Sequence, residues 1–369
     1  MPQTKRLRCL DAFRGLTVAA MVAVNCSGRE EVYAPLAHAA WHGWSLADLV
    51  FPSFLVALGA SALFSFEARR TKGQAPSDFA RYALLRALGL FALGMLVDLV
   101  LFSTPGGARW PGVLQRIALC SLGVSGLLIF EKPAAEASIA LGLLAGYWLA
   151  MMYVPVPGHG AGILTPEGNL AYWLDRTLFA GHTSDPLGDE EGLLSTLPAL
   201  ATALLGLCAG RKIAQDGLET RAAARLGVLG LALAALGAVW GRFFPVNKHL
   251  WTSSYALLSG GLAVAGLGAL ALTIEGRTAR WAAPFEALGR HALTAYILSG
   301  LLYGIQEFVV VRLPDGAQGN VKLWLVARLF DPWLSARAAS LAYALAFTAL
   351  CAAAAALYEA RLTRSGGPR

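Results

Sequence analysis

The strongest constraint in this sequence is the recurrence of apolar stretches about as long as a bilayer is thick. A transmembrane helix needs roughly 20 mostly apolar residues, and only 14% of the 369 residues here are charged, against about 25% in soluble domains. We therefore predict an all-α, polytopic transmembrane helix bundle that forms a single domain over residues 1–369. About ten spans are expected in the lipid bilayer, at approximately residues 9–26, 45–66, 83–102, 111–130, 134–154, 192–210, 223–244, 250–273, 284–305 and 336–358.

The basic residues indicate which side of the membrane each loop faces. Most of the 30 Lys and Arg residues lie between the apolar stretches, in clusters such as residues 5–8, 69–70, 211–212 and 361–369. Loops rich in Lys and Arg stay in the cytoplasm, so both termini are expected there, in a bacterial inner membrane. The outer loops are then residues 27–44, 103–110, 155–191, 245–249 and 306–335. The net charge of +7 follows from these clusters and not from a basic face, so we expect no nucleic-acid binding.

Two amphipathic stretches interrupt the longest outer loops, at residues 172–179 and 322–330. Each combines Trp, Leu and Phe with an Arg. A segment of this kind anchors itself in the membrane interface or covers a binding site as a lid, and the sequence leaves both interpretations open.

The five cysteines are widely scattered, and no CxxC or Cys/His zinc spacing is present. Isolated cysteines in apolar segments behave as small hydrophobic residues, and we expect no metal site. Cys26 keeps a second interpretation, as a nucleophile, because it lies close to the polar residues of the first outer loop.

Charged residues inside apolar stretches are costly in a bilayer and are usually paired or functional. Asp11 and Arg14 are three residues apart and share a helix face. This spacing suits either an internal ion pair or an arginine that faces an anionic ligand from the cytoplasm. Asp98 and Arg116 flank a short outer loop, and we expect them to pair with each other.

The first outer loop and the adjoining ends of its two spans carry the richest set of polar groups. Histidine exchanges protons near neutral pH, a carboxylate can fix its tautomer, and an amide can donate a hydrogen bond to an oxyanion. Tryptophans suit sugar rings or the membrane interface. From these residues alone His38 is a catalytic candidate, although a histidine in a loop is more often structural. The set comprises Asn25, His38, Trp41, Trp44 and Asp48.

Seven blocks of sequence resemble the heparan-α-glucosaminide N-acetyltransferase family, and they occur in the family's order. The first three are RCLDAFRG at residues 8–15, Asn25, and HAAW at residues 38–41 leading to Asp48 and the Phe-Pro pair at 51–52. The other four are GVLQRIA at 112–118, DEEGLLSTLP at 189–198, FPVNKHLW at 244–251 and PFEALGRHAL at 284–293. Together they span almost the whole chain.

The resemblance implies a transmembrane acetyltransferase that takes an acetyl group from cytosolic acetyl-CoA and delivers it to an amino sugar or glycan outside. The family's active-site histidine, asparagine and nearby aspartate fall on His38, Asn25 and Asp48. The chain departs from its relatives at His42 and His291, where they often have Asn. The sequence does not identify the acceptor, and heparan sulfate itself is not expected.

The resemblance is also the basis for expecting a homodimer. The sequence has a GxxxG pattern at Gly237 and Gly241. Such a pattern packs helices closely, either within a chain or between chains, and we favour packing within the chain.

Acetyl-CoA carries phosphates, which need cations. Arg14 is the first candidate because its block matches the family's, and Arg290 and Arg86 are candidates that also fit ordinary flanking charges. His38 is then expected to act as a general base with Asn25 at the oxyanion, or to carry the acetyl group itself. On the outer side, the acceptor is expected to bind near Trp41, Trp44, Asn247, Lys248 and Arg116.

A second class of protein fits the same features. A proton-coupled secondary transporter of a sugar or related solute would also have many spans with intramembrane charges, and His38 and Asp48 would relay its protons. Transporters often carry inverted repeats, and no convincing internal repeat is visible in the sequence. Thiol release separates the two classes, because an acyltransferase frees CoA in detergent and a carrier does not.

Overall fold

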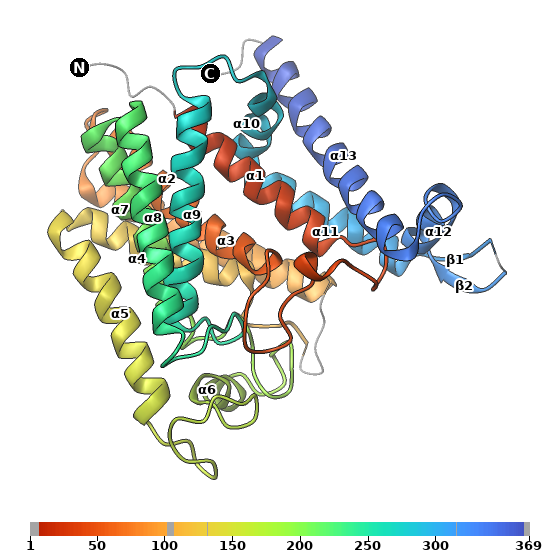
Figure 1. The fold of residues 1–369 in the computed structure, drawn as a ribbon, viewed down its shortest axis with the longest axis horizontal. Helices are drawn as coiled ribbons and strands as arrows, with labels where there is room; N and C mark the ends of the chain where they lie inside the picture. Colours follow the sequence, from red (N-terminus) through yellow and green to blue (C-terminus); the bar gives the residue numbers. More distant parts are fainter. Residues whose placement is uncertain (1–6, 102–106, 131, 315, 365–369) are drawn as a thin grey trace. The chain divides into compact units, whose positions relative to one another are not determined.

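The computed structural model describes residues 7–101, 107–130, 132–314 and 316–364. Within these residues the chain forms thirteen α-helices and one two-stranded antiparallel hairpin (Figure 1), which confirms the predicted all-α class. Some parts of the predicted features lie outside the described residues: Lys5 and Arg6, residue 102 at the end of one span, residues 103–106 and residue 315 of two outer loops, and residues 365–369 of the last basic cluster.

The chain divides into two compact units that alternate along the sequence. Among the described residues, the first unit contains Ala39–Trp44 and Leu55–Leu272, and the second contains residues 7–38, Ser45–Phe54 and residues 273–364. The chain therefore passes from the second unit to the first at the peptide between His38 and Ala39. Helix α2 (Val50–Arg70) begins in the second unit and continues in the first.

In the first unit, glycines allow the long helices to approach each other closely. A Cβ atom at Gly59 of α2 would lie 1.8 Å from the carbonyl oxygen of Ala203, and one at Gly237 of α8 would lie 2.3 Å from the amide nitrogen of Leu258 in α9. Gly237 thus packs within the chain, as we favoured. The other helices of this unit are α3 (Pro76–Leu101), α4 (Val113–Ile129), α5 (Pro133–Tyr153), α6 (Leu170–Leu178), α7 (Thr196–Asp216), α8 (Thr220–Trp240) and α9 (Ser253–Ile274).

The second unit is built around the packing of α1 (Arg8–Asn25) against α10 (Ala283–Arg290). A Cβ atom at Gly15 would lie 1.8 Å from the carbonyl oxygen of Phe285, and one at Gly289 would lie 1.8 Å from that of Asp11. Only glycine fits at these two crossing points. The remaining elements are η1 (Ala34–Leu36), η2 (Ala47–Leu49), η3 (Arg280–Ala282), α11 (Ala292–Phe308), β1 (Val310–Arg312), β2 (Gln318–Asn320), α12 (Val321–Leu329) and α13 (Ala336–Arg364).

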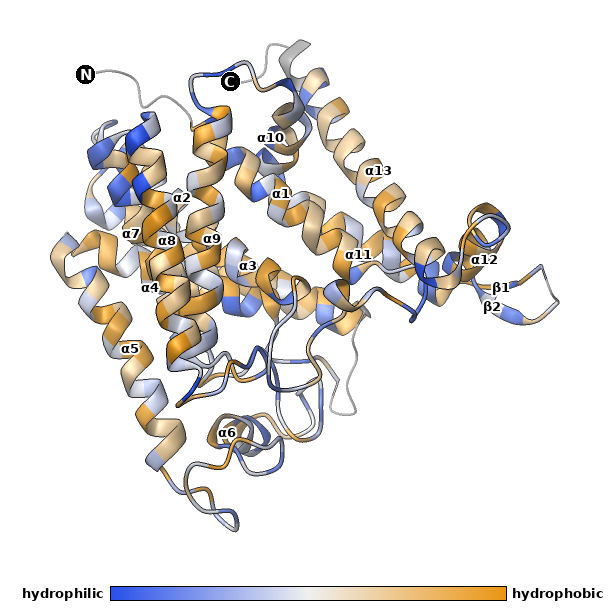
Figure 2. Ribbon diagram, viewed as in Figure 1, coloured by the Kyte–Doolittle hydropathy of each residue, from blue (hydrophilic) through white to orange (hydrophobic). Residues whose placement is uncertain are grey.

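Seven of the described helices are long and apolar enough to cross a membrane, namely α2, α3, α5, α7, α8, α9 and α13. Figure 2 shows them mainly in the hydrophobic colours. The other three predicted spans also fall on helices, but α1 carries three charged residues, α4 has only 17 residues, and the stretch 284–305 is divided at His291 into α10 and α11. These features support a multi-pass membrane protein, while the count of ten spans and the side of the termini stay predictions.

Both amphipathic stretches form short helices, α6 and α12. Each begins at an asparagine cap: Asn169 Oδ1 accepts a hydrogen bond from the Tyr172 amide, and Asn320 Oδ1 accepts one from the Leu323 amide, at 2.8 and 2.9 Å. Such caps satisfy backbone donors at the first turn. Whether these helices anchor or cover a site stays open.

Candidate active site

A histidine from the first predicted outer loop and an aspartate from the start of the next predicted span meet in the second unit. His38 Nδ1 lies 2.6 Å from Asp48 Oδ1. Asp48 belongs to η2, and its side chain is fully buried, whereas that of His38 is 41% exposed. The other carboxylate oxygen, Asp48 Oδ2, accepts hydrogen bonds from the amide and hydroxyl of Ser45, at 2.9 and 3.2 Å. The carboxylate is therefore held from both sides.

This geometry determines which ring nitrogen of His38 is basic. An ionised carboxylate only accepts hydrogen bonds, so the contact with Asp48 places the ring proton on Nδ1. The lone pair is then on Nε2. A carboxylate that fixes the tautomer in this way also stabilises the imidazolium that forms when Nε2 takes a proton. The pair predicted from the sequence thus has the arrangement that a general base requires.

The third predicted catalytic residue, Asn25, is the last residue of α1. Its side chain is exposed and makes no hydrogen bond with the described part of the chain. The neighbouring Cys26 is buried and packs with Val18 and Tyr343 in the apolar core of the second unit. This packing matches its expected role as a small hydrophobic residue and does not favour the alternative of a nucleophile.

A second cluster of polar groups lies in the first unit and is centred on His249. His249 Nδ1 is 2.7 Å from Glu190 Oε1, and its Nε2 is 3.0 Å from the carbonyl oxygen of Ala39. The ring stacks on Trp41, with centroids 5.1 Å apart and planes at 25°. Lys248 Nζ lies 3.5 Å from Glu190 Oε2. Trp41 itself is fixed by its indole N–H, which donates to the carbonyl oxygen of Leu164 at 2.9 Å.

Sequence reasoning assigned no role to His249 or Glu190. Both lie within blocks that resemble the family, at 244–251 and 189–198, so the signal was present. The two blocks are far apart in sequence, and nothing in either one indicates that their polar side chains meet.

Asn247, predicted to bind the acceptor, is fully buried. Its Oδ1 accepts a hydrogen bond from the amide of Leu250 at 2.8 Å, and its Nδ2 lies 3.3 Å from His42 Nδ1. Burial lowers the pKa of His42, so the ring is uncharged at neutral pH and its Nδ1 accepts from the amide. Asn247 thus shapes the turn that carries Lys248. Trp44 is exposed on the same loop as Trp41.

Arg116 of α4 is almost fully buried, and its guanidinium holds the loop that carries Glu190. Its Nη2 donates to the carbonyl oxygens of Glu190 and Gly192, at 2.8 and 3.2 Å, and to the Ser195 hydroxyl. Its Cζ lies 5.0 Å from the centre of a Trp251 ring. The role predicted for Arg116 in binding the acceptor stays a prediction.

The expected Asp98–Arg116 ion pair is wrong. Asp98 Oδ2 instead accepts a hydrogen bond from Gln115 Nε2, at 2.8 Å. Adjacent positions on a helix point in directions about 100° apart, so Gln115 and Arg116 face different neighbours. The guanidinium instead bonds the Glu190 loop, which is distant in sequence, through its Nη2.

The three arginines predicted to bind the CoA phosphates all have partners. In the second unit, Arg14 Nη1 lies 3.7 Å from Asp11 Oδ1, which forms the internal ion pair considered from the sequence. Arg290 Nε lies 2.9 Å from Glu359 Oε1, and His291 shares that carboxylate at 2.7 Å. In the first unit, Arg86 donates to the Ser121 hydroxyl at 3.1 Å.

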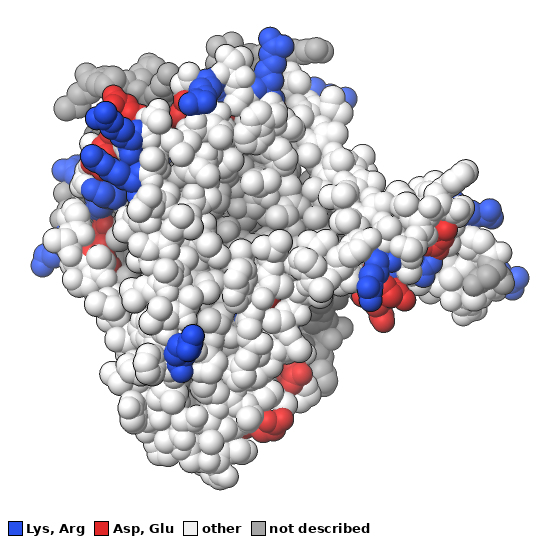
Figure 3. Space-filling model, viewed as in Figure 1, with Lys and Arg blue, Asp and Glu red and all other residues white. Residues whose placement is uncertain are grey.

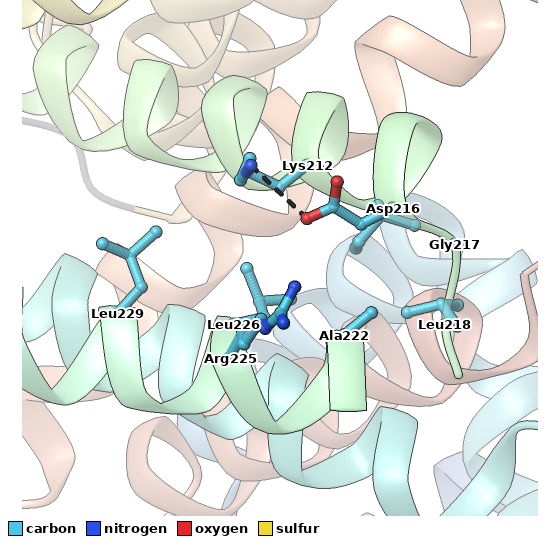
Figure 4. Close-up of a pocket in the computed structure, with 9 residues that line it drawn as sticks. Lys212, Asp216, Gly217, Leu218, Ala222, Arg225, Leu226 and Leu229 are labelled. Carbon is cyan, nitrogen blue, oxygen red and sulfur yellow. Dashed lines mark ion pairs between the residues drawn. The ribbon is translucent and has the colours of Figure 1, made fainter. Parts of the chain in front are cut away.

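Two cavities lie in the first unit beside clusters of basic residues. Figure 3 shows Lys and Arg side chains gathered over the ends of α7 and α8. Between these ends lies a cavity of about 210 Å³, with the Lys212–Asp216 ion pair on one wall and Arg225 with Leu226 on the other (Figure 4). The second cavity, of about 270 Å³, lies beside Arg69 and Arg70. Both are smaller than a typical site for a drug-sized ligand, about 300–1,000 Å³, and no predicted site residue lines either one.

Long apolar helices, together with a histidine fixed by a buried carboxylate, define a multi-pass membrane protein with a candidate acid–base centre. The catalytic family described as heparan-alpha-glucosaminide N-acetyltransferase matches residues 6–242. The chain belongs to this family.

Two curated relatives carry the same description. The heparan-alpha-glucosaminide N-acetyltransferase of Homo sapiens is 29% identical over 349 residues, covering 79% of this chain and 52% of the relative. That of Mus musculus is 29% identical over 316 residues, covering 69% of this chain and 48% of the relative. The chain thus spans about half the length of the curated relatives that it matches.

Proposed function

We propose that this chain is a transmembrane acetyltransferase that moves an acetyl group from cytosolic acetyl-CoA to an amino sugar or glycan on the extracytoplasmic side. Membership of the family supports the reaction class. The observation that carries the proposal is the contact between His38 Nδ1 and Asp48 Oδ1 at 2.6 Å, with Asp48 buried and held by Ser45. It gives His38 the tautomer that transfer from a thioester to an amine requires.

In the proposed reaction, the nitrogen of the acceptor amine attacks the carbonyl carbon of the thioester. Nε2 of His38 takes the proton that the amine loses, and the Asp48 carboxylate stabilises the resulting imidazolium. The carbon–sulfur bond then breaks, and CoA leaves as a thiolate. The proton on His38 passes to this thiolate, which restores the neutral ring.

A second route begins with attack by His38 itself. Nε2 would form a bond to the acetyl carbon while the carbon–sulfur bond breaks and CoA leaves as a thiolate. The acceptor amine would then displace the histidine, and the proton that the amine loses would pass to the thiolate. Asn25 is proposed to donate to the oxyanion in either route, since its side chain is exposed at the end of α1. Trapping an acetyl-histidine in the absence of acceptor, by mass spectrometry, would eliminate the direct route.

The binding groups are proposed as follows. Arg14, Arg290 and Arg86 would bind the CoA phosphates by exchanging the partners that they now have. Such exchange is favourable because a phosphate is a stronger acceptor than a hydroxyl and competes with a carboxylate.

The acceptor would bind near Trp41, Trp44, Asn247, Lys248 and Arg116. A homodimer in a bacterial inner membrane completes the proposal.

The test uses the full chain purified in detergent, with acetyl-CoA as donor and glucosamine as the acceptor probe. Release of the CoA thiol supports an acetyltransferase, and a proton-coupled carrier would release none. His38→Ala should abolish this release, because general-base catalysis is worth about 10²–10⁴-fold. His159→Ala is the matched control, because His159 is an exposed loop histidine. Undiminished turnover in His38→Ala would overturn the assignment of His38 in both routes.

A further inference from the structure

The two hydrogen bonds of His249 require a charged ring. Its Nδ1 faces Glu190 Oε1 at 2.7 Å, and its Nε2 faces the carbonyl oxygen of Ala39 at 3.0 Å. Both neighbours are acceptors, so each ring nitrogen must carry a hydrogen. A neutral ring has only one N–H and would turn a lone pair towards an oxygen. His249 is therefore an imidazolium in this arrangement.

The charged groups around the ring support the same state. Glu190 also faces Lys248 Nζ at 3.5 Å, which keeps the carboxylate ionised. The Trp41 ring stacks on His249 at 5.1 Å, and an aromatic face attracts a cation. Burial alone would lower the pKa of His249, but the hydrogen bond and charge of Glu190 outweigh burial and the repulsion from Lys248, so the pKa is raised. His42 and Tyr172 pack on Trp41.

The carbonyl group that His249 holds belongs to the residue directly after His38. Ala39 is the first residue of its segment in the first unit, and His38 is the last residue of its segment in the second. We propose that His249 is a positioning residue, which as an imidazolium held by Glu190 clamps the Ala39 carbonyl and so orients the chain that bears His38. This proposal rests on the proposed function of His38.

The clamp makes activity depend on pH in a defined direction. Above the pKa of His249 the ring loses one proton. The carboxylate of Glu190 retains the proton on Nδ1, because a charge-assisted hydrogen bond is the stronger of the two. Nε2 then turns a lone pair towards the Ala39 carbonyl, and the clamp opens. Turnover should therefore fall as the pH rises through the pKa of His249, which the Glu190 carboxylate raises.

Three substitutions distinguish a hydrogen-bonding role of His249 from a packing role. His249→Phe keeps a ring on Trp41 but removes both donors, and it should lower kcat about tenfold or more with the KM for acetyl-CoA unchanged. His249→Gln keeps one amide donor that does not titrate. It should recover much of the activity and lose the alkaline decline. Glu190→Gln should move the decline to lower pH, because the carboxylate no longer raises the pKa of His249.

His182→Phe is the matched control. His182 also stacks on a tryptophan, Trp110, at 4.4 Å, and its Nδ1 bonds to the Ala108 carbonyl at 2.9 Å. It does not touch the Ala39 segment, so kcat and the pH profile should match the unaltered chain. A thermal unfolding curve for each variant checks that it is folded.

The measurements are thiol release from acetyl-CoA with glucosamine, from pH 6 to about 10, and nitrogen-15 NMR of the histidine rings. The NMR spectrum should show both nitrogens of His249 protonated at pH 7, and this signature should be lost in Glu190→Gln. A neutral His249 ring at pH 7, or an unchanged kcat and alkaline decline in His249→Phe, overturns the clamp. If His38→Ala is inactive in that case, only the clamp fails. If His38→Ala is fully active, the proposed function of His38 fails as well.

Discussion

Oδ1 of Asp48 lies 2.6 Å from Nδ1 of His38, while Oδ2 of the same carboxylate is bound by the backbone and side chain of Ser45. The carboxylate cannot rotate without losing the Ser45 hydrogen bonds. Its burial also strengthens its interaction with a charged His38 ring, because water does not screen it. We therefore propose that Asp48 stabilises the His38 imidazolium and is not a second base.

Asp48→Asn tests this assignment directly. An amide at this position can turn its NH₂ towards Nδ1, which moves the ring proton to Nε2 and removes the base. Thiol release should fall by at least ~100-fold, since the corresponding change in a Ser-His-Asp triad lowers kcat by about 10⁴. Thermal unfolding should change little. Asp78→Asn, at the exposed start of α3, is the control that should keep full activity, and a wild-type rate in Asp48→Asn would refute the tautomer argument.

Arg116→Lys should destabilise the protein although it keeps the charge. The lysine side chain is shorter, so its amine would not reach the position of Nη2, the guanidinium nitrogen that bonds the Glu190 and Gly192 carbonyls and the Ser195 hydroxyl, and it would lose the planar group beside Trp251. Leaving buried acceptors unpaired costs about 1–3 kcal/mol each, so the unfolding midpoint should drop by several degrees. Arg176→Lys, at a more exposed position that also bonds carbonyl groups, should have a smaller effect. Equal midpoints for the two variants would contradict this role for Arg116.

Gly289→Ala tests the packing of α1 against α10. The added methyl group would lie 1.8 Å from the carbonyl oxygen of Asp11, a contact that forces the two helices apart. Overpacking of this kind costs about 1–3 kcal/mol or more. Gly300→Ala in α11 is the control, because a Cβ atom there meets nothing within 4 Å. We expect a lower unfolding midpoint for the first variant and an equal or higher one for the second.

Asp175→Asn should change how stability depends on pH. Asp175 is fully buried in α6, and burial raises the pKa of its carboxyl group to about 7, from 3.8. The unfolded chain therefore loses this proton first as pH rises, so the group lowers stability progressively between about pH 4 and 7. An amide keeps the hydrogen bond from the Leu193 amide without ionising. The variant should equal or fall slightly below the unaltered chain at pH 5 and exceed its unfolding midpoint at pH 8.

One result would contradict the role of Asp175: a pH dependence of the unfolding midpoint between pH 5 and pH 8 that is the same in both proteins. Asp185→Asn, in an exposed turn of the same loop, should reproduce the pH dependence of the unaltered chain.

The sequence predicted those parts of the fold that depend on local patterns. Each predicted span coincides with helix, because apolar length is a local property, and α6 and α12 follow from short amphipathic stretches. The hairpin β1–β2 was missed, since two three-residue strands have no alternation long enough to detect. The division of the predicted ninth span at His291 was also missed, because the apolar pattern continues across it.

In the candidate site, too, the contacts between residues close in sequence were predicted and those between distant segments were not. His38 and Asp48 were predicted together because they lie only ten residues apart, in the first outer loop and at the start of the span that follows it. The contacts of His249 with Glu190 and Ala39 join segments far apart in the chain, and only the folded structure brings them together. Arg116 was given the wrong ionic partner for the same reason, since its acceptors are backbone carbonyls that carry no signal in the sequence.

Helix α4 has only 17 residues, and the buried Arg116 is its fourth. At 1.5 Å per residue it rises about 26 Å, which is less than the roughly 30 Å thickness of a hydrocarbon core. If α4 spans the bilayer as predicted, either the bilayer becomes thinner around it, or the Arg116 end of the helix does not reach the membrane surface. The protein should therefore respond to acyl-chain length, and lipids with shorter chains should match this part of it better than long ones.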